Sequence, residues 1–236
     1  MKHFILDEAD RMLDMGFSDD INKIAQYLPK QRQNIMFSAT MPPKIRTLAK
    51  NVMVNPTEVN IAISQTAEGI IQAAYCVYDP QKIDLLKSLL KGKDDLNSII
   101  VFTSRKATVK DIVRGLKKLS MDADGISSDL NQDEREEVLR RFRNKRLRIL
   151  VATDIISRGI DIDSIDLVIN YDVPNDPEDY VHRVGRTARA KSSGVALTFI
   201  NDKDQRDFQK IEQLIKREVN KLSLIHISEP TRQEAI

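Results

Sequence analysis

An acidic pair follows the first apolar stretch of the chain. Residues 4–6 lead directly into Asp7 and Glu8, and Asp10 comes two residues later. One carboxylate could hold Mg²⁺ directly or through water, while its neighbour could orient or deprotonate a water molecule that attacks a phosphate. Taken alone, these residues fit equally well a strand that merely ends in a charged turn. The pair indicates a nucleotide-hydrolysing site only if other chemically capable residues lie beside it.

Two hydroxyl residues, Ser38 and Thr40, follow the second apolar stretch, residues 34–37. Ligands of parallel sheets bind where the carboxyl ends of the strands meet, so these hydroxyls would lie beside the first strand's carboxylates. They could equally cap the helix that is expected to begin near Pro42 and Pro43.

Two later stretches carry polar residues at regular spacing. Residues 153–161 read Thr-Asp-Ile-Ile-Ser-Arg-Gly-Ile-Asp, and residues 182–189 read His-Arg-Val-Gly-Arg-Thr-Ala-Arg. Arg186 and Arg189 lie three residues apart, so on a helix they would share one face and could clamp one phosphate. An isolated arginine pair, however, is more often a partner in surface ion pairs.

The elements that must position these residues alternate along the chain. The expected strands are residues 4–6, 34–37, 58–63, 74–78, 98–102, 123–126, 148–152, 167–170 and 195–199. The expected helices are residues 19–27, 43–51, 81–90, 106–119, 132–142, 176–184 and 203–220. Alternation of this kind, with continuous Ile and Val runs, predicts an α/β fold whose parallel sheet is covered on both faces.

The composition fits a folded protein of a reducing compartment. Hydrophobic residues make up 41% and charged residues 31%, which excludes a wholly disordered chain. No apolar run approaches the ~18 residues of a membrane span, and the N-terminus lacks a signal-peptide pattern. Cys76 is the single cysteine and cannot form an internal disulfide. We therefore expect a cytoplasmic protein.

Charge and aromatic content constrain how nucleic acid could be bound. The net charge of 37 − 35 = +2 is uninformative, but residues 132–148 and 182–191 are locally basic. Such stretches are either solvated faces or contacts to a polyanion. Aromatic residues make up 5% of the chain and Trp is absent, so stacking on bases is not the expected mode of contact.

Together, these stretches resemble the DEAD-box RNA helicases of helicase superfamily 2. The resemblance rests on Asp-Glu-Ala-Asp, Ser-Ala-Thr, Thr-Asp-X₃-Arg-Gly-X-Asp and His-Arg-X-Gly-Arg-Thr-X-Arg in this order, with support from residues 99–103 and Gln132-X-X-Arg135. It implies two tandem parallel-sheet RecA-like domains of the P-loop NTPase type. The first would be partial, at residues 1–63, and the second complete, at 70–222, with a linker at 64–69. Residues 223–236 resemble a translated sequencing adapter, so we expect a non-native tail there.

The resemblance also implies a role for each matching residue. Asp7 would hold the Mg²⁺ of bound ATP through water, and Glu8 would activate the hydrolytic water. Asp10, Ser38, Thr40 and His182 would couple hydrolysis to closure of the two domains. The remaining roles concern ligands: Arg186 and Arg189 for the γ-phosphate, Asp161 and Gly159 for the nucleotide, and Thr153, Arg135 and Arg158 for the RNA backbone.

The chain departs from the family pattern in one respect that bears on activity. The family's glutamine motif and phosphate-binding loop lie upstream of the acidic pair, and this sequence begins six residues before that pair. Its only Gly-Lys pair, Gly92-Lys93, does not fit G-x-x-x-x-G-K-[ST]. We therefore expect the chain to be truncated and inactive alone. Two alternatives stay open, namely an ATP-independent RNA-binding module and a DNA-directed superfamily 2 translocase.

Overall fold

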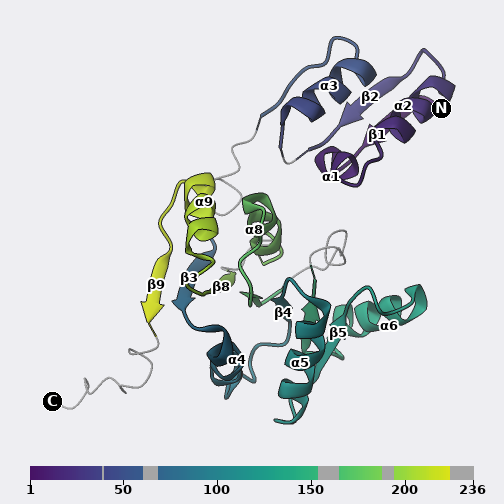
Figure 1. Ribbon diagram of the computed structural model, residues 1–236. Helices are drawn as coiled ribbons and strands as arrows, with labels where there is room; N and C mark the ends of the chain where they lie inside the picture. The colour runs from purple at the N-terminus through teal and green to yellow at the C-terminus, as the bar shows by residue number, and fades with distance from the viewer. Residues whose placement is uncertain (39, 61–68, 154–164, 188–193, 224–236) are drawn as a thin grey trace. The chain divides into compact units, whose positions relative to one another are not determined.

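Two parallel sheets organise the residues that this computed structural model describes, which are 1–38, 40–60, 69–153, 165–187 and 194–223. The sheets belong to separate units, Met1–Ile61 and Ala62–Ile236 (Figure 1). The expected α/β fold with parallel strands is therefore confirmed.

The first unit packs helices against one face of a two-stranded sheet. Its elements are β1 (His3–Leu6), α1 (Ala9–Asp14), α2 (Ser18–Tyr27), β2 (Gln33–Met36) and α3 (Pro43–Val52). Leu6, Ile21, Leu48 and Val52 form its buried core. Pro43 opens α3, where its missing amide N–H and fixed φ are favourable.

The second unit contains a seven-stranded sheet in the order β5-β6-β4-β7-β8-β3-β9. The strands are β3 (Ile71–Cys76), β4 (Ile99–Phe102), β5 (Ala123–Ile126), β6 (Ile149–Ala152), β7 (Leu167–Asn170), β8 (Val195–Ile200) and β9 (Asn220–Ser223). Every adjacent pair is parallel. The carboxyl ends of the central strands therefore meet at one edge of the sheet.

Helices cover both faces of this sheet. They are α4 (Lys82–Leu90), which follows the 3₁₀ turn η2 (Asp79–Gln81), and α5 (Lys106–Lys117), α6 (Gln132–Arg143), α8 (Pro177–Val184) and α9 (Gln205–Ile215). Alternate residues of β4 point to opposite faces: Ile99 and Val101 pack with α4 and α5, whereas Ile100 and Phe102 pack with α6, α8 and α9. A run of four apolar residues is thus buried on both sides.

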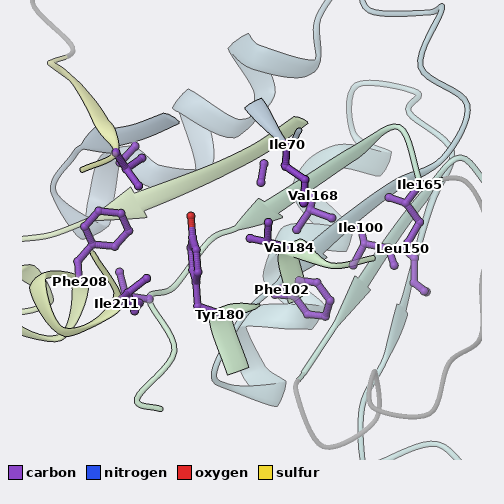
Figure 2. Packing of buried hydrophobic residues seen from close by; sticks show 14 of the residues in the cluster. Ile70, Ile100, Phe102, Leu150, Ile165, Val168, Tyr180, Val184, Phe208 and Ile211 are labelled. Atoms are coloured by element: carbon purple, nitrogen blue, oxygen red, sulfur yellow. The ribbon is translucent and has the colours of Figure 1, made fainter. Parts of the chain in front are cut away.

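The aromatic ring of Tyr180 joins α8 to α9 and to the sheet. Figure 2 shows it between Phe208 and Ile211 on one side and Val184 and Phe102 on the other. Its ring meets that of Phe208 edge-on, with centroids 6.1 Å apart. Its hydroxyl donates a hydrogen bond to Gln72 Oε1 at 2.8 Å. The packing fixes α8, the helix that carries His182.

The structure differs from the expected elements in several places. The strand expected over 74–78 is Ile71–Cys76. Residues 58–60 form no strand, and the short helix α1 was not expected. The helix expected over 203–220 ends at Ile215, where Lys216 adopts a left-handed conformation with φ of 51°. Beyond it, the Glu212 carboxylate accepts the Val219 amide, and the chain turns into β9 alongside β3.

Candidate functional site

The carboxylate of Asp10 bridges the ends of β1 and β2. Its Oδ2 accepts hydrogen bonds from the Thr40 amide at 3.0 Å and the Thr40 hydroxyl at 3.2 Å. The Ser38 hydroxyl accepts from the Asp10 amide at 3.2 Å and donates to the Thr40 carbonyl at 2.8 Å. The acidic and hydroxyl residues that lay about thirty positions apart in the sequence therefore form one network.

Asp7 and Glu8 lie exposed at the carboxyl end of β1. Asp7 Oδ1 accepts the Glu8 amide at 2.9 Å, and the Glu8 carboxylate pairs with Arg11 at 2.7 Å. Glu8 has a left-handed backbone with φ of 49°. A non-glycine residue in this region carries local strain, which is found preferentially at functional sites. Among the described residues, no cluster of three His, Cys, Asp or Glu side chains is arranged to hold a metal.

In the second unit, Asp172 follows β7 and binds the loop that follows β4. Its Oδ2 accepts from the Thr103 hydroxyl at 2.6 Å and from the Ser104 amide at 2.9 Å. Its Oδ1 accepts from Lys82 at 3.1 Å. Burial tends to raise the pKa of Asp172, but these hydrogen bonds and the Lys82 charge outweigh it and hold the pKa below its ordinary value.

Arg183 connects α8 to the same strand end. Its guanidinium donates to the Asn170 side chain at 3.2 Å and to the Asp172 carbonyl at 2.8 Å, and it lies 5.2 Å from the centre of the Phe102 ring. Only 2% of this residue is exposed. Sequence reasoning had assigned no role to Arg183, although it lies within the His-Arg-X-Gly-Arg stretch.

The basic stretch 182–189 is not one helix. Helix α8 ends at Val184, so His182 lies on the helix and Arg186 lies in the turn beyond it. Thr187 is the last described residue of this stretch; it is buried, and its hydroxyl donates to the Ile165 carbonyl at 2.7 Å. Arg186 therefore lies beyond the helix and not on a helical face as expected, and Arg189 lies outside the described residues.

The two RNA candidates that are described lie near the carboxyl ends of β5 and β6. Thr153 follows β6, and the Thr103 amide donates to the preceding carbonyl, that of Ala152, at 3.0 Å. Arg135 lies in the first turns of α6, with its Nε buried and without a hydrogen-bond partner in the described structure. Arg158, Gly159 and Asp161 lie outside the described residues.

Helix α6 starts at a capping box. The Asn131 side chain accepts the Glu134 amide at 2.9 Å, and the Glu134 carboxylate accepts the Asn131 amide at 2.8 Å. Just before it, Asp129 pairs with Lys110 at 2.7 Å and Lys106 at 2.9 Å. Hydrogen bonds from Lys110 and then Lys106 lower the pKa of Asp129 to about 2.

The buried cation Lys82 was also missed by sequence reasoning. It contacts Asp79 and Asp172 at 3.1 Å and Asp204 at 3.9 Å, and its ammonium lies 5.6 Å from the centre of the Tyr171 ring. A lysine at the start of an amphipathic helix gives no signal of burial, because its partners come from distant segments. Burial raises the pKa of Asp204 in this cluster.

Comparison with protein-family models gives two matches. The DEAD/DEAH box helicase model matches residues 1–48, and the helicase conserved C-terminal domain model matches residues 81–191. The first contains Asp7, Glu8 and Asp10, and the second contains Arg135, His182 and Arg186. Both groups of candidate residues therefore fall inside matched segments.

Two curated relatives illustrate the similarity in sequence. The chain is 39% identical over 237 residues to the ATP-dependent RNA helicase CshA of Limosilactobacillus reuteri, covering 100% of this chain and 46% of that protein. It is 40% identical over 236 residues to the DEAD-box ATP-dependent RNA helicase CshA of Bacillus subtilis, covering 98% of this chain and 46% of that protein. The chain thus spans about half the length of these relatives.

Solved structures show the same similarity in fold. Dbp5 of S. cerevisiae bound to RNA and ADP BeF3 matches with a TM-score of 0.84 at 32% identity, over 94% of this chain and 60% of that chain. A DEAD box protein from Methanococcus jannaschii matches with a TM-score of 0.63 at 40% identity, over 94% and 60%. The fold is that of RecA-like helicase domains. With the two family models and these relatives in agreement, the chain belongs to the DEAD-box helicase family.

Proposed function

We propose that this chain is part of an ATP-dependent RNA helicase that couples ATP hydrolysis to local unwinding of RNA duplexes. The observation that carries the proposal is the network in which Asp10, on the helix that follows the acidic pair, binds Ser38 and Thr40. A strand that merely ended in a charged turn would not need these bonds. The relatives of similar sequence are named ATP-dependent RNA helicases, and the Dbp5 structure contains RNA.

The acidic pair fits a magnesium–nucleotide complex chemically. Asp7 and Glu8 are exposed, and their carboxylate oxygens are the ligands that Mg²⁺ prefers. When bound, Mg²⁺ supplies charge neutralisation at the phosphates of ATP. In this proposal Asp7 binds the hydrated ion and Glu8 orients and deprotonates the attacking water. The ion pair with Arg11 competes for the Glu8 carboxylate, so Glu8 must be released or shared during the reaction.

The second unit contributes cations and RNA contacts. Arg186 and Arg189 offset negative charge on the transferred phosphate, while Gly159 and Asp161 contact the nucleotide, with Asp161 accepting from its ribose. His182 acts with Asp10, Ser38 and Thr40 to couple hydrolysis to domain closure. Thr153, Arg135 and Arg158 hold RNA through phosphates and 2′-hydroxyls, without reading the sequence. We also propose a cytoplasmic location, which the presence of a single cysteine supports.

No described helix is long and apolar enough to cross a bilayer.

A chimera tests this function. The segment of Bacillus subtilis CshA that precedes the residue matching Met1 is joined to this chain, and ATP hydrolysis is measured with single-stranded RNA and with single-stranded DNA. We expect stimulation by RNA and little by DNA, and loss of turnover in a Glu8→Gln chimera. Equal stimulation by DNA would favour a DNA translocase. RNA binding without hydrolysis in a folded chimera would favour an ATP-independent binding module.

A further inference from the structure

Asp172 occupies a junction between three segments of the second unit. Its two carboxylate oxygens hold the loop after β4, through Thr103 and Ser104, and the buried amine of Lys82 at the start of α4. Its backbone carbonyl accepts Arg183 of α8 at 2.8 Å. One residue therefore ties together a loop and two helices, and its partner Lys82 lies 90 positions away in the sequence.

The side chains that meet at Asp172 are buried, so the loss of one partner would leave another polar group unpaired away from water. Thr103 is 0% exposed and Lys82 is 2% exposed. A buried ammonium without a carboxylate partner, or the reverse, is strongly unfavourable, so Lys82 and Asp172 hold each other in place. The hydrogen bonds to the carboxylate are charge-assisted and hence stronger than neutral ones.

Both segments that Asp172 holds lead to candidate site residues. The Thr103 amide donates to the Ala152 carbonyl, which directly precedes Thr153. On the other side, Arg183 is the neighbour of His182 and lies one turn before Arg186, whose amide donates to the Arg183 carbonyl at 3.2 Å. The RNA side and the phosphate side of the unit therefore meet at Asp172.

We propose that Asp172, held by Lys82, is a positioning residue that keeps the loop after β4 and the end of α8 in one fixed arrangement. Through these segments it sets the places of Thr153 and Arg186 relative to each other. The roles of these two residues, in contacting RNA and phosphate, rest on the proposed RNA helicase function. The arrangement itself rests only on the contacts described above.

The structure supplies a matched control at the opposite end of the same strand. Asp166 precedes β7, and its carboxylate accepts the amides of Asn97 and Ser98 at 2.8 and 2.9 Å. It therefore ties β7 to β4 at their amino ends, as Asp172 does at their carboxyl ends. Asp166→Asn removes a comparable bond while leaving the candidate site untouched.

Amide hydrogen exchange of the 236-residue chain tests the arrangement. The asparagine of Asp172→Asn has one acceptor oxygen in place of two. If that oxygen accepts from the Lys82 ammonium, the NH₂ group faces Thr103 and Ser104, and the loop loses its acceptor. We expect exchange at Ser104 to rise roughly ten- to a hundredfold, with a smaller rise at Arg186 and Thr187 and none at Ser98. Asp166→Asn should raise exchange at Asn97 and Ser98 alone. Unchanged rates at Ser104 and Arg186, or equal rises at both ends, would overturn the proposal.

Affinity for RNA is a second measurement, and a merely structural role of Asp172 would leave it unchanged. Binding of a fluorescent single-stranded oligouridine is measured at equal folded fractions of each variant. We expect Asp172→Asn to weaken binding ~10-fold through misplacement of Thr153, and Asp166→Asn to leave it unchanged. Equal affinities in both variants would contradict positioning. If the unchanged chain binds no RNA, the proposed function fails, and the exchange measurement still decides the arrangement.

A double variant guards against loss of folding. If Asp172→Asn does not fold, Lys82→Met/Asp172→Asn removes the charge from both partners and lets the asparagine oxygen accept from the loop. We expect this double variant to fold and to recover part of the protection at Ser104. Recovery of folding without any recovery at Ser104 would show that Asp172 does not position the loop.

Discussion

At the scale of single residues, the candidate site is defined by what its carboxylates bind. Asp10 accepts hydrogen bonds from Thr40, and Asp172 accepts them from the loop after β4. Asp129 forms ion pairs with two lysines of α5. In each case the partners are far away in the sequence. Such bonds are strong enough to measure one at a time.

Replacing Asp10 should loosen the link between β1 and β2. Asp10→Ala leaves the Thr40 amide and hydroxyl without their acceptor, which typically costs about 1–3 kcal/mol. We expect faster amide exchange at Thr40 and a lower free energy of unfolding for the first unit. Asp14→Ala is the control, because Asp14 is exposed on the same helix. Similar exchange at Thr40 in both variants would contradict the bridging role.

The pKa of Asp129 gives a pH prediction with a definite sign. Because Lys110 and Lys106 lower that pKa from 3.8 to about 2, the folded state favours the carboxylate. The group therefore adds stability above pH 4, which is lost as the pH falls toward 2. An NMR titration should show a midpoint near 2 for Asp129, which moves up in Lys110→Met. A midpoint that is the same in both proteins would refute the assignment.

At the scale of elements, the apolar strand β4 was predictable, whereas the polar edge strand β9 and the short helix α1 were not. The stretch 98–102 was expected as a strand of a sheet covered on both faces, and Ile99–Phe102 is such a strand, with a neighbour on each side. The sequence of β9, Asn-Lys-Leu-Ser, has little strand character and pairs on one side only. Helix α1 is six residues long, too short for a clear periodic pattern.

The same contrast holds for the site. Asp10, Ser38 and Thr40 were expected to meet because parallel strands bring their carboxyl ends to one edge, and they do. Lys82 and Asp172 could not be paired from the sequence, since 90 positions separate them and each side chain type is usually exposed. The local sequence pattern predicts which residues lie at the carboxyl ends of the strands. The pairing of distant side chains depends on the order of the strands in the sheet, which the local pattern does not give.

The cap of α6 offers a test at this scale. Asn131→Ala removes the acceptor of the Glu134 amide and should destabilise the helix that carries Arg135 by ~1 kcal/mol. Asn144→Ala, at the other end of α6, should change stability by less than ~0.5 kcal/mol, because no side-chain cap bond is described there. Urea unfolding of both variants gives the comparison. Equal losses in the two would show that the capping box does not stabilise α6.

At the scale of the whole molecule, the 236 residues contain the acidic pair but no phosphate-binding loop sequence of the form G-x-x-x-x-G-K-[ST]. Asp7 and Glu8 therefore have no positioned substrate in this chain alone. We expect the purified chain to release phosphate from ATP no faster than its Glu8→Gln variant, with or without RNA. RNA-stimulated release above that variant would refute this expectation.

The most direct test of the central claim uses Arg186 in the chimera with the preceding segment of Bacillus subtilis CshA. If Arg186 stabilises charge on the transferred phosphate, Arg186→Ala should slow RNA-stimulated hydrolysis by roughly 10³–10⁵. Arg186→Lys should rescue it poorly, because a point charge cannot replace the planar guanidinium. Arg206→Ala, at an exposed position on α9, is the control and should keep the full rate. A folded Arg186→Ala chimera that keeps more than about a tenth of the rate would contradict the account.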